Sequence, residues 1–351
     1  MDCGANMTRR RLLTAVWAAG LVIAGCAATA ARAETAAEFY KGKTVRFVVG
    51  VAVGGGFDAY ARMLAPHIGK LLEANVVVEN QIGAGGMLAM NQLMIAQPDG
   101  LRIKIVNGTP TLLSQLLGQE NIKFDFTKIP HLGLIAAEPW GMLVSPDSPI
   151  KTPVDLMKPG LKIRWGGTGP TGGPSDGASI TCEALQIDCR VVLGYRGSAE
   201  IALAVQRGEI DALYVTDTSA ATYEKGNQAR VVGIAARKRS ELLAHVPTFY
   251  EALKLSDEQK WWLDFRAELN EYGRVLLTMP GIPADRLAHL RSVIAKVLTD
   301  PAVIAEGART QRPIEYRDGP AMEAIAKKLL TQLSDERKAQ VRDVVLRKYI
   351  N

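Results

Sequence analysis

Residues 45–86 constrain the fold of this chain more than any other stretch. A β-branched run at 45–49 leads to Gly54, Gly55 and Gly56, and a helical stretch follows to Leu72. A second strand-like run and a second glycine cluster complete the stretch. A strand that ends in glycines and opens a helix brings backbone N–H groups and the positive helix end to one point. This pattern predicts an α/β unit with a site for an anion, either a carboxylate or a phosphate, at the strand end.

The same alternation of strand, turn and helix continues along most of the chain, which predicts an α/β fold with largely parallel sheets. A strand at 162–165 runs into a second glycine-rich turn at 166–176. The pattern indicates a first lobe at 34–140, a second lobe at 141–240, and a return to the first lobe at 241–351. Two crossings of this kind form a hinge beside a ligand cleft.

Residues 1–33 have the character of a signal peptide. Three arginines at 9–11 precede an apolar segment at 12–25 that is short for a membrane span, and Ala33 ends a small-x-small cleavage pattern. The arginines also fit twin-arginine export. Two alternatives are a lipobox in which Cys26 is lipidated and a retained N-terminal anchor. Cleavage after Ala33 and a periplasmic location are the preferred interpretation.

The net charge of +6 belongs partly to this segment, which holds four of the 42 Lys and Arg residues and one of the 36 Asp and Glu residues. The chain beyond it carries a net charge of +3. Basic residues nowhere form a run with interleaved aromatics, so nucleic acid is not an expected partner. The remaining length exceeds what one core usually serves and favours two domains.

Cysteine spacing agrees with export. Cys182 and Cys189 are seven residues apart, and we expect them to pair in an oxidising compartment, although two buried thiols are the alternative. The four histidines are scattered, and none has metal-ligand spacing to another histidine or to a cysteine. We therefore expect neither a metal nor a cofactor.

An enzymatic alternative rests on the first glycine cluster. Gly54, Gly56 and Ala59 match the looser dinucleotide fingerprint, and Glu79 follows at the end of the next strand, as in a nicotinamide-dependent oxidoreductase. Export argues against it because free dinucleotide is scarce outside the cytoplasm. The second glycine turn has no role in that scheme, and no acid–base pair is evident. A hydrolase is disfavoured because Ser175, which stands in a Gly-x-Ser-x-Gly pattern at 173–177, has no obvious histidine partner in the sequence.

Nine segments of the chain, in order, resemble the substrate-binding proteins of tripartite tricarboxylate transporters, the Bug family. They are VRFVV at 45–49, GGGFDAYAR at 54–62, VVVENQIGAGG at 76–86, QPDG at 97–100, GYRG at 194–197, RGEID at 207–211, ARKRS at 236–240, VPT at 246–248 and PGIP at 280–283. The chain departs from the family pattern at 51–53, where proline is common, in the longer second glycine turn, and at 216–218. These departures concern the identity of the ligand more than the fold.

The resemblance implies a fold like that of type II periplasmic binding proteins. It also implies a non-enzymatic monomer that closes on a small organic carboxylate and hands it to membrane transporter subunits. In this family backbone N–H groups and water hold the carboxylate at two glycine-rich tips. The ligand-binding residues implied here are Val53, Gly54, Gly55, Gly56, Phe57, Asp58, Thr109, Thr168, Gly169, Pro170, Thr171, Gly172, Ser175, Tyr195, Arg196, Thr216 and Asp217.

Three of these residues have a plainer interpretation beside the functional one. Asp58 is equally compatible with a helix-start acid that the helix dipole favours. Arg196 is compatible with a surface cation, and Asp217 with a helix cap. If Asp217 faces the cleft, it favours a ligand hydroxyl or ammonium over a second carboxylate.

Overall fold

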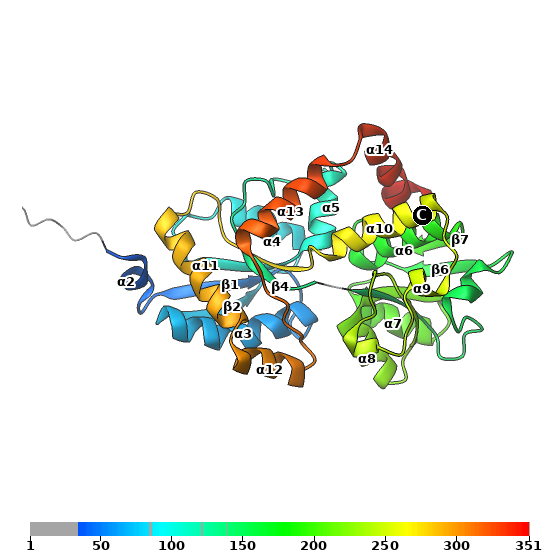
Figure 1. Cartoon of the computed structure of the whole chain (residues 1–351), viewed down its shortest axis with the longest axis horizontal. Coiled ribbons are helices and arrows are strands. Elements are labelled where there is room, and N and C mark those ends of the chain that lie inside the picture. The colour runs from blue at the N-terminus through cyan, green and yellow to red at the C-terminus, as the bar shows by residue number, and fades with distance from the viewer. Residues whose placement is uncertain (1–33, 84–85, 121, 138, 351) are drawn as a thin grey trace, which may run out of the picture.

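The computed structural model describes residues 34–83, 86–120, 122–137 and 139–350. The predicted signal peptide, with its cleavage after Ala33 and the alternative lipidation at Cys26, lies outside these residues. Two α/β units lie side by side, each built on its own sheet (Figure 1). We name them the first unit and the second unit in the order in which the chain enters them.

The first unit contains a six-stranded sheet with the strand order β11-β4-β10-β3-β1-β2. Its strands are β1 (Thr44–Val49), β2 (Asn75–Asn80), β3 (Arg102–Asn107), β4 (His131–Ala136), β10 (Arg274–Leu277) and β11 (Arg317–Asp318). β1 pairs in parallel with both β2 and β3, as the alternating pattern predicts. β10, which comes from the returning part of the chain, lies between β3 and β4 and pairs antiparallel with both.

Alternate side chains of β1 define the two faces of this sheet. Val45, Phe47 and Val49 are buried in one core with α3 (Gly56–Leu72) and α11 (Ala284–Leu298). The opposite face packs in a second core with α4 (Met87–Met94), α5 (Gly108–Leu116) and α13 (Gly319–Thr331). Since side chains alternate along a strand, both faces need apolar cover, and the connecting helices supply it.

The second unit contains a five-stranded sheet with the strand order β7-β6-β8-β5-β9. Its strands are β5 (Trp140–Val144), β6 (Lys162–Gly166), β7 (Asp188–Val192), β8 (Ala212–Thr216) and β9 (Arg230–Ile234). The helices α6 (Gly173–Leu185), α7 (Ser198–Gln206) and α8 (Asp217–Lys225) connect them. The predicted pairing of Cys182 with Cys189 is present and ties α6 to β7.

The chain divides between the units differently from the predicted ranges. It leaves the first unit between β4 and β5, and α9 (Phe249–Ala252) and α10 (Asp257–Asn270) still belong with the second sheet. Thr248 bridges to Ile234, and α10 packs on α6. The return therefore comes just before β10, not at residue 240. Trp262 and Phe265 on α10 are buried, and this apolar side holds the helix against the second unit.

A third crossing near the C-terminus was not predicted. After α13 the chain passes to α14 (Asp335–Asp343) and then to a π-helical turn (Val344–Lys348), which packs on both α14 and α6. Ile350 then bridges to Val191 of β7. In Figure 1 α13 lies over the first unit and α14 over the second. The remaining helices are α2 (Ala36–Tyr40), α12 (Pro301–Arg309) and the 3₁₀ turns Pro153–Met157 and Glu241–Leu243.

Two glycines on one side of α6 explain how large aromatic rings pack beneath it. A Cβ at Gly173 would lie 2.0 Å from the Trp140 ring, and one at Gly177 would lie 2.1 Å from the Tyr214 ring. These two rings stack with centroids 6.1 Å apart. Trp140 and Trp165 are both buried core residues, so neither offers a ring face to a ligand here.

Within residues 34–83, 86–120, 122–137 and 139–350, no helix combines the length and apolar character required to cross a membrane.

Candidate functional site

The first predicted tip follows β1 and leads into α3. Gly54 has a φ of +85°, a conformation that favours glycine, and its N–H donates to Asp58 Oδ2 at 2.9 Å. Gly55 is the N-cap of α3 and supplies no side-chain cap. The first-turn N–H groups of a helix have no partner within the helix. The helix start that the sequence predicted is therefore present, with the backbone at Gly55 and Gly56 forming it.

The Asp58 carboxylate holds this tip together through hydrogen bonds. It is 2% exposed, and besides Gly54 it accepts hydrogen bonds from Arg62 Nε and Asn80 Nδ2, each at 2.9 Å. Asn80 also donates to Val51 O at 2.9 Å. Burial would raise the pKa of Asp58, but the hydrogen bonds from Arg62, Gly54 and Asn80 outweigh it and lower the pKa below its ordinary value. Asp58 therefore shapes the tip as an ionised carboxylate.

The second predicted tip follows β6 and leads into α6. Gly172 is the N-cap of α6, again without a side-chain cap, and its N–H donates to Gly169 O at 2.9 Å. Thr168 Oγ1 lies against Gly172, where a Cβ would be 2.2 Å from it. No neighbouring atom lies within 4 Å of a Cβ built on Gly169. The tip is a closed turn whose middle has room for a side chain.

Thr171 connects the second tip to the first unit. Its Oγ1 lies 2.7 Å from Ser114 Oγ on α5 and donates to Gln119 Oε1 at 3.2 Å. Ser175, one helical turn later, is fully buried, and among the described residues its Oγ has no hydrogen-bond partner. It lies beneath the tip, against Gly167. Thr171 therefore serves as a contact between the units, and Ser175 as a residue of the tip's interior.

A buried ion pair supports the second tip from below. Asp176 Oδ1 lies 3.1 Å from Arg266 Nη2 on α10, and both side chains are essentially inaccessible. The Arg266 guanidinium also lies over the Trp140 ring, 5.0 Å from its centroid. Burial raises the pKa of Asp176 to about 7, although the charge of Arg266 opposes this. The pair fixes α10 against α6 and therefore belongs to the scaffold.

A third tip, after β8, opens α8. Thr216 Oγ1 lies 3.1 Å from Thr218 Oγ1, and Asp217 Oδ1 accepts from the Thr218 N–H at 2.7 Å. Asp217 Oδ2 accepts from Ser240 Oγ at 2.6 Å. Burial raises the pKa of Asp217, against the lowering effects of Ser240, Arg274 and Thr218. Asp217 is therefore the first residue of α8 and is buried there, while the N-cap position predicted for it belongs to Thr216.

Arg274 was not predicted, yet it joins the first tip to the third. Its Nη2 donates to Thr218 Oγ1 at 3.3 Å and lies 3.8 Å from a Cβ built on Gly56. The guanidinium lies over Phe57 and Tyr60, 5.2 and 4.6 Å from their ring centroids. The only signal in the sequence was a charged residue opening an apolar strand, RVLL at 274–277. A single charge in that position has no specific meaning by itself.

The remaining predicted residues are dispersed around these tips. Thr109 is fully buried, and its Oγ1 donates to Leu269 O at 2.7 Å, so it connects α5 to α10. Val53 is 68% exposed. Tyr195 is half-buried and Arg196 is exposed, with the backbone N–H of Arg196 bonded to Glu200 Oε2 at 2.7 Å. Pro170 is half-buried within the second tip.

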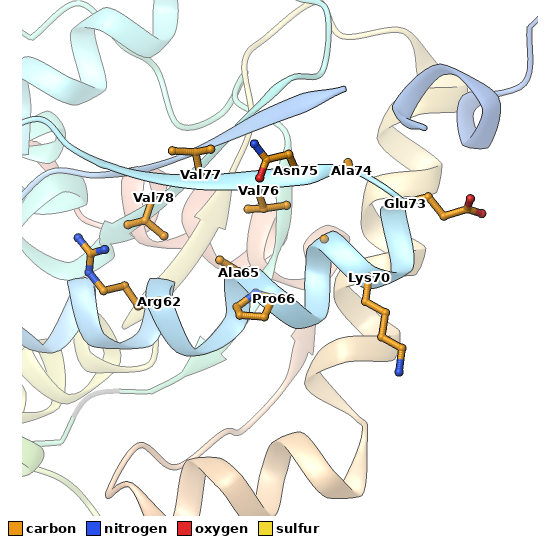
Figure 2. A pocket seen from close by; sticks show the side chains of 11 residues that line it. Arg62, Ala65, Pro66, Lys70, Glu73, Ala74, Asn75, Val76, Val77 and Val78 are labelled. Atoms are coloured by element: carbon orange, nitrogen blue, oxygen red, sulfur yellow. The ribbon is translucent and has the colours of Figure 1, made fainter. Parts of the chain in front are cut away.

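A hollow of about 770 Å³ lies elsewhere, between α3 and the edge strand β2. Figure 2 shows Val76 and Val78 directed toward α3 and Val77 directed away from it. Lys70 and Glu73 extend outward at its margin. The hollow contains none of the residues of the three tips, so we do not identify it with the predicted site.

The oxidoreductase alternative gains nothing from the structure. Glu79, the expected ribose ligand, forms an ion pair with Arg46 at 3.3 Å. Within the described part of the chain, no group of three or more His, Cys, Asp or Glu residues could hold a metal ion.

Comparison with known proteins places the chain among transport receptors. Residues 60–305 match the model of the tripartite tricarboxylate transporter family receptors. A UPF0065 protein from the gbd 5' region of Cupriavidus necator is 30% identical over 256 residues, covering 70% of this chain and 75% of that protein. Protein BugT of Bordetella pertussis is 23% identical over 251 residues, covering 70% and 74%.

Solved structures share the fold. The periplasmic binding protein BugD aligns with a TM-score of 0.70 at 22% identity, covering 89% of this chain and 100% of BugD. Rpa4515 of R. palustris, solved with adipate, aligns with a TM-score of 0.70 at 17% identity, covering 86% and 97%. MatC of Rhodopseudomonas palustris, solved with bound malate, aligns at 0.62 and 22%, covering 86% and 99%. The chain belongs to the tripartite tricarboxylate transporter receptor family, as its sequence motifs predicted.

Proposed function

We propose that this chain is an extracytoplasmic solute-binding protein that captures a small organic carboxylate and delivers it to a tripartite tricarboxylate-type transporter. One observation carries the proposal most directly. α3 in the first unit and α6 in the second each begin at a glycine N-cap without a side-chain cap. Two helix starts with uncapped N–H groups, one in each unit, suit an anion held between the units.

The family and its structural neighbours support the ligand class. The matching family consists of receptors for tricarboxylate transporters, and two neighbours of the same fold were solved with malate and adipate. Backbone N–H groups recognise the carboxylate group itself and read little of the rest of the ligand. The proposal therefore specifies a carboxylate group, and the carbon skeleton that carries it is to be identified by a ligand screen.

The proposed contacts follow the tips. The backbone at Gly55 and Gly56 would hold the carboxylate from the first unit, and the backbone at 168–172 would hold it from the second. Phe57 and Val53 would border the ligand, while Asp58 and Ser175 act by shaping the two tips. Thr216, Asp217, Tyr195 and Arg196 would border its distal end. Partly buried amides stabilise an anion more than exposed charges do, because water does not compete for them.

The proposed cycle involves no chemical step. Ligand would stabilise the closed arrangement of the two units by its higher affinity for that arrangement, and the membrane subunits would respond to closure. We propose that the chain acts as a periplasmic monomer, exported by the segment at 1–33. Neither a metal nor a cofactor has a role in this scheme.

A thermal-unfolding screen tests the proposal. The panel contains mono-, di-, tri- and aromatic carboxylates, with NAD as the arm for the oxidoreductase alternative. A true ligand at about 100 times its Kd stabilises the folded protein by roughly 2.7 kcal/mol. We expect one class of carboxylate to raise the unfolding temperature and NAD to have no effect. The absence of any shift across the carboxylates would overturn the proposed ligand class.

A further inference from the structure

Lys104 is buried within the first unit without a compensating charge. It lies in the middle of β3 and is 1% exposed. Among the described residues its Nζ has no hydrogen-bond partner. A lysine ammonium carries three donors, and leaving them unsatisfied in the interior is costly. The interior position of this ammonium therefore requires an explanation.

The side chain reaches the point where β1 ends and α4 begins. A Cβ built on Gly50, directly after β1, would lie 3.2 Å from Lys104 Nζ and 3.0 Å from the Gly86 Cα. Gly86 is the N-cap of α4, has a φ of +95°, and supplies no side-chain cap. Lys104 thus directs a positive charge toward the positive end of the α4 dipole. The repulsion between the two charges adds to the free-energy cost of burying the ammonium.

No acidic side chain among the described residues offsets this cost. Lys104 pairs in register with Val48 on β1 and with Leu277 on β10. The nearest acid in the sheet register, Glu79, pairs with Arg46. Burial alone lowers the pKa of Lys104 to about 7, with no charged neighbour contributing. The surroundings therefore provide a cation and a helix start, and they lack an anion.

We propose that Lys104 and the first turn of α4 form an anion subsite that takes a carboxylate of the bound ligand at the junction of Gly50 and Gly86. This inference rests on the proposed function, and it adds a side-chain cation to the backbone contacts at the tips. Gly50 and Gly86 are half-buried, and neither places a side chain over the ammonium. A carboxylate at this junction would supply the missing charge and accept from both Lys104 and the helix.

Calorimetric titration of Lys104→Met tests the subsite. Methionine keeps the length and apolar stem of lysine and removes its charge. Lys70→Met is the matched control. Lys70 is an exposed lysine on α3, and its substitution removes one positive charge as Lys104→Met does. The probes are butyrate, succinate, malate, adipate and citrate, each titrated into all three proteins.

We expect Lys104→Met to bind the best wild-type ligand at least tenfold more weakly, which is about 1.4 kcal/mol, and Lys70→Met to bind it within about twofold. Equal or tighter binding by Lys104→Met would overturn the subsite while leaving the proposed function intact. If the wild type binds none of the probes, the proposed function fails, and the subsite fails with it. A cooperative unfolding transition of ligand-free Lys104→Met, recorded in urea, checks that this variant is folded.

Discussion

Arg274 Nη2 donates to Thr218 Oγ1 at 3.3 Å and so joins β10 of the first unit to α8 of the second. The same guanidinium packs over Phe57 at the first tip. Arg274 therefore contacts the start of α3 and the start of α8 together. A change in the relative position of the two units must alter this contact, which links the arrangement of the tips to closure.

Thr218→Val should weaken ligand binding. Valine keeps the shape of threonine and removes the oxygen that contacts both Arg274 and Thr216. The described arrangement of the two units then loses its Arg274–Thr218 hydrogen bond, worth about 0.5–1.5 kcal/mol. We expect the Kd to rise by roughly twofold to tenfold, measured by calorimetric titration. Thr222→Val, which alters a hydroxyl bonded only within α8, is the control. An unchanged Kd in Thr218→Val would show that the contact does not contribute to closure.

Thr171→Val tests the corresponding contact of the second tip. The substitution removes the hydroxyl that contacts the buried Ser114 and the half-buried Gln119, so both side chains lose this partner. We expect the free energy of unfolding in urea to fall by about 1–3 kcal/mol. The double variant with Ser114→Ala should lose less than the sum of the two single losses, because both remove the same hydrogen bond. Fully additive losses would show that the two hydroxyls act independently.

Gly177→Ala should destabilise the second unit. Helix propensity alone would favour alanine over glycine by about 1 kcal/mol, so the loss must come from packing. The added Cβ would lie 2.1 Å from the Tyr214 ring, which is fully buried and stacked on Trp140. We expect a net loss of about 1–3 kcal/mol in the free energy of unfolding. Gly169→Ala, where the added Cβ meets no neighbour within 4 Å, should unfold like the wild type. Equal stability of both variants would contradict the described packing of α6.

Ligand-free stability should depend on pH through Lys104. Its ordinary pKa is 10.5, and burial lowers the folded-state pKa to about 7. Between these values the unfolded chain binds more protons than the folded protein, so stability rises with pH. Below pH 7 both states are protonated and the full cost of burial remains. Lys104→Met should therefore be more stable than the wild type at pH 6, with an advantage that shrinks by pH 10 in urea titrations. A stability difference between the two proteins that stays constant from pH 6 to pH 10 would contradict a lowered pKa of Lys104 in the folded protein.

The sequence predicted the fold well because its strongest signals are local. The β-branched run at 45–49, the glycines that follow and the amphipathic helix to Leu72 all reappear as β1, the first tip and α3. The disulfide between Cys182 and Cys189 was also predicted from short spacing. In each case the physical cause lies within a few residues of its effect.

The predictions failed where the cause lies far away in the sequence. The helical pattern at 257–270 indicates a helix but does not show that Trp262 packs on the second unit. The pattern at 335–343 likewise indicates a helix but does not show that the chain crosses to the second unit there. Lys104 and Arg274 are single charges in short strands, and only the packed structure shows what surrounds them. Thr109 was predicted to bind ligand, and nothing in the sequence indicated that its hydroxyl bonds to Leu269 O, 160 residues away.

The central claim is that two glycine tips, one in each unit, hold a carboxylate between them. Its most direct test is calorimetric titration of the wild type, Gly55→Val and Gly169→Val with the carboxylate that gives the largest thermal shift. A Cβ meets no atom closer than 3.5 Å at Gly55 and none within 4 Å at Gly169, so both variants should fold. The account predicts saturable binding by the wild type and at least a hundredfold loss in each variant, which is about 2.7 kcal/mol. Wild-type affinity in both folded variants would contradict it.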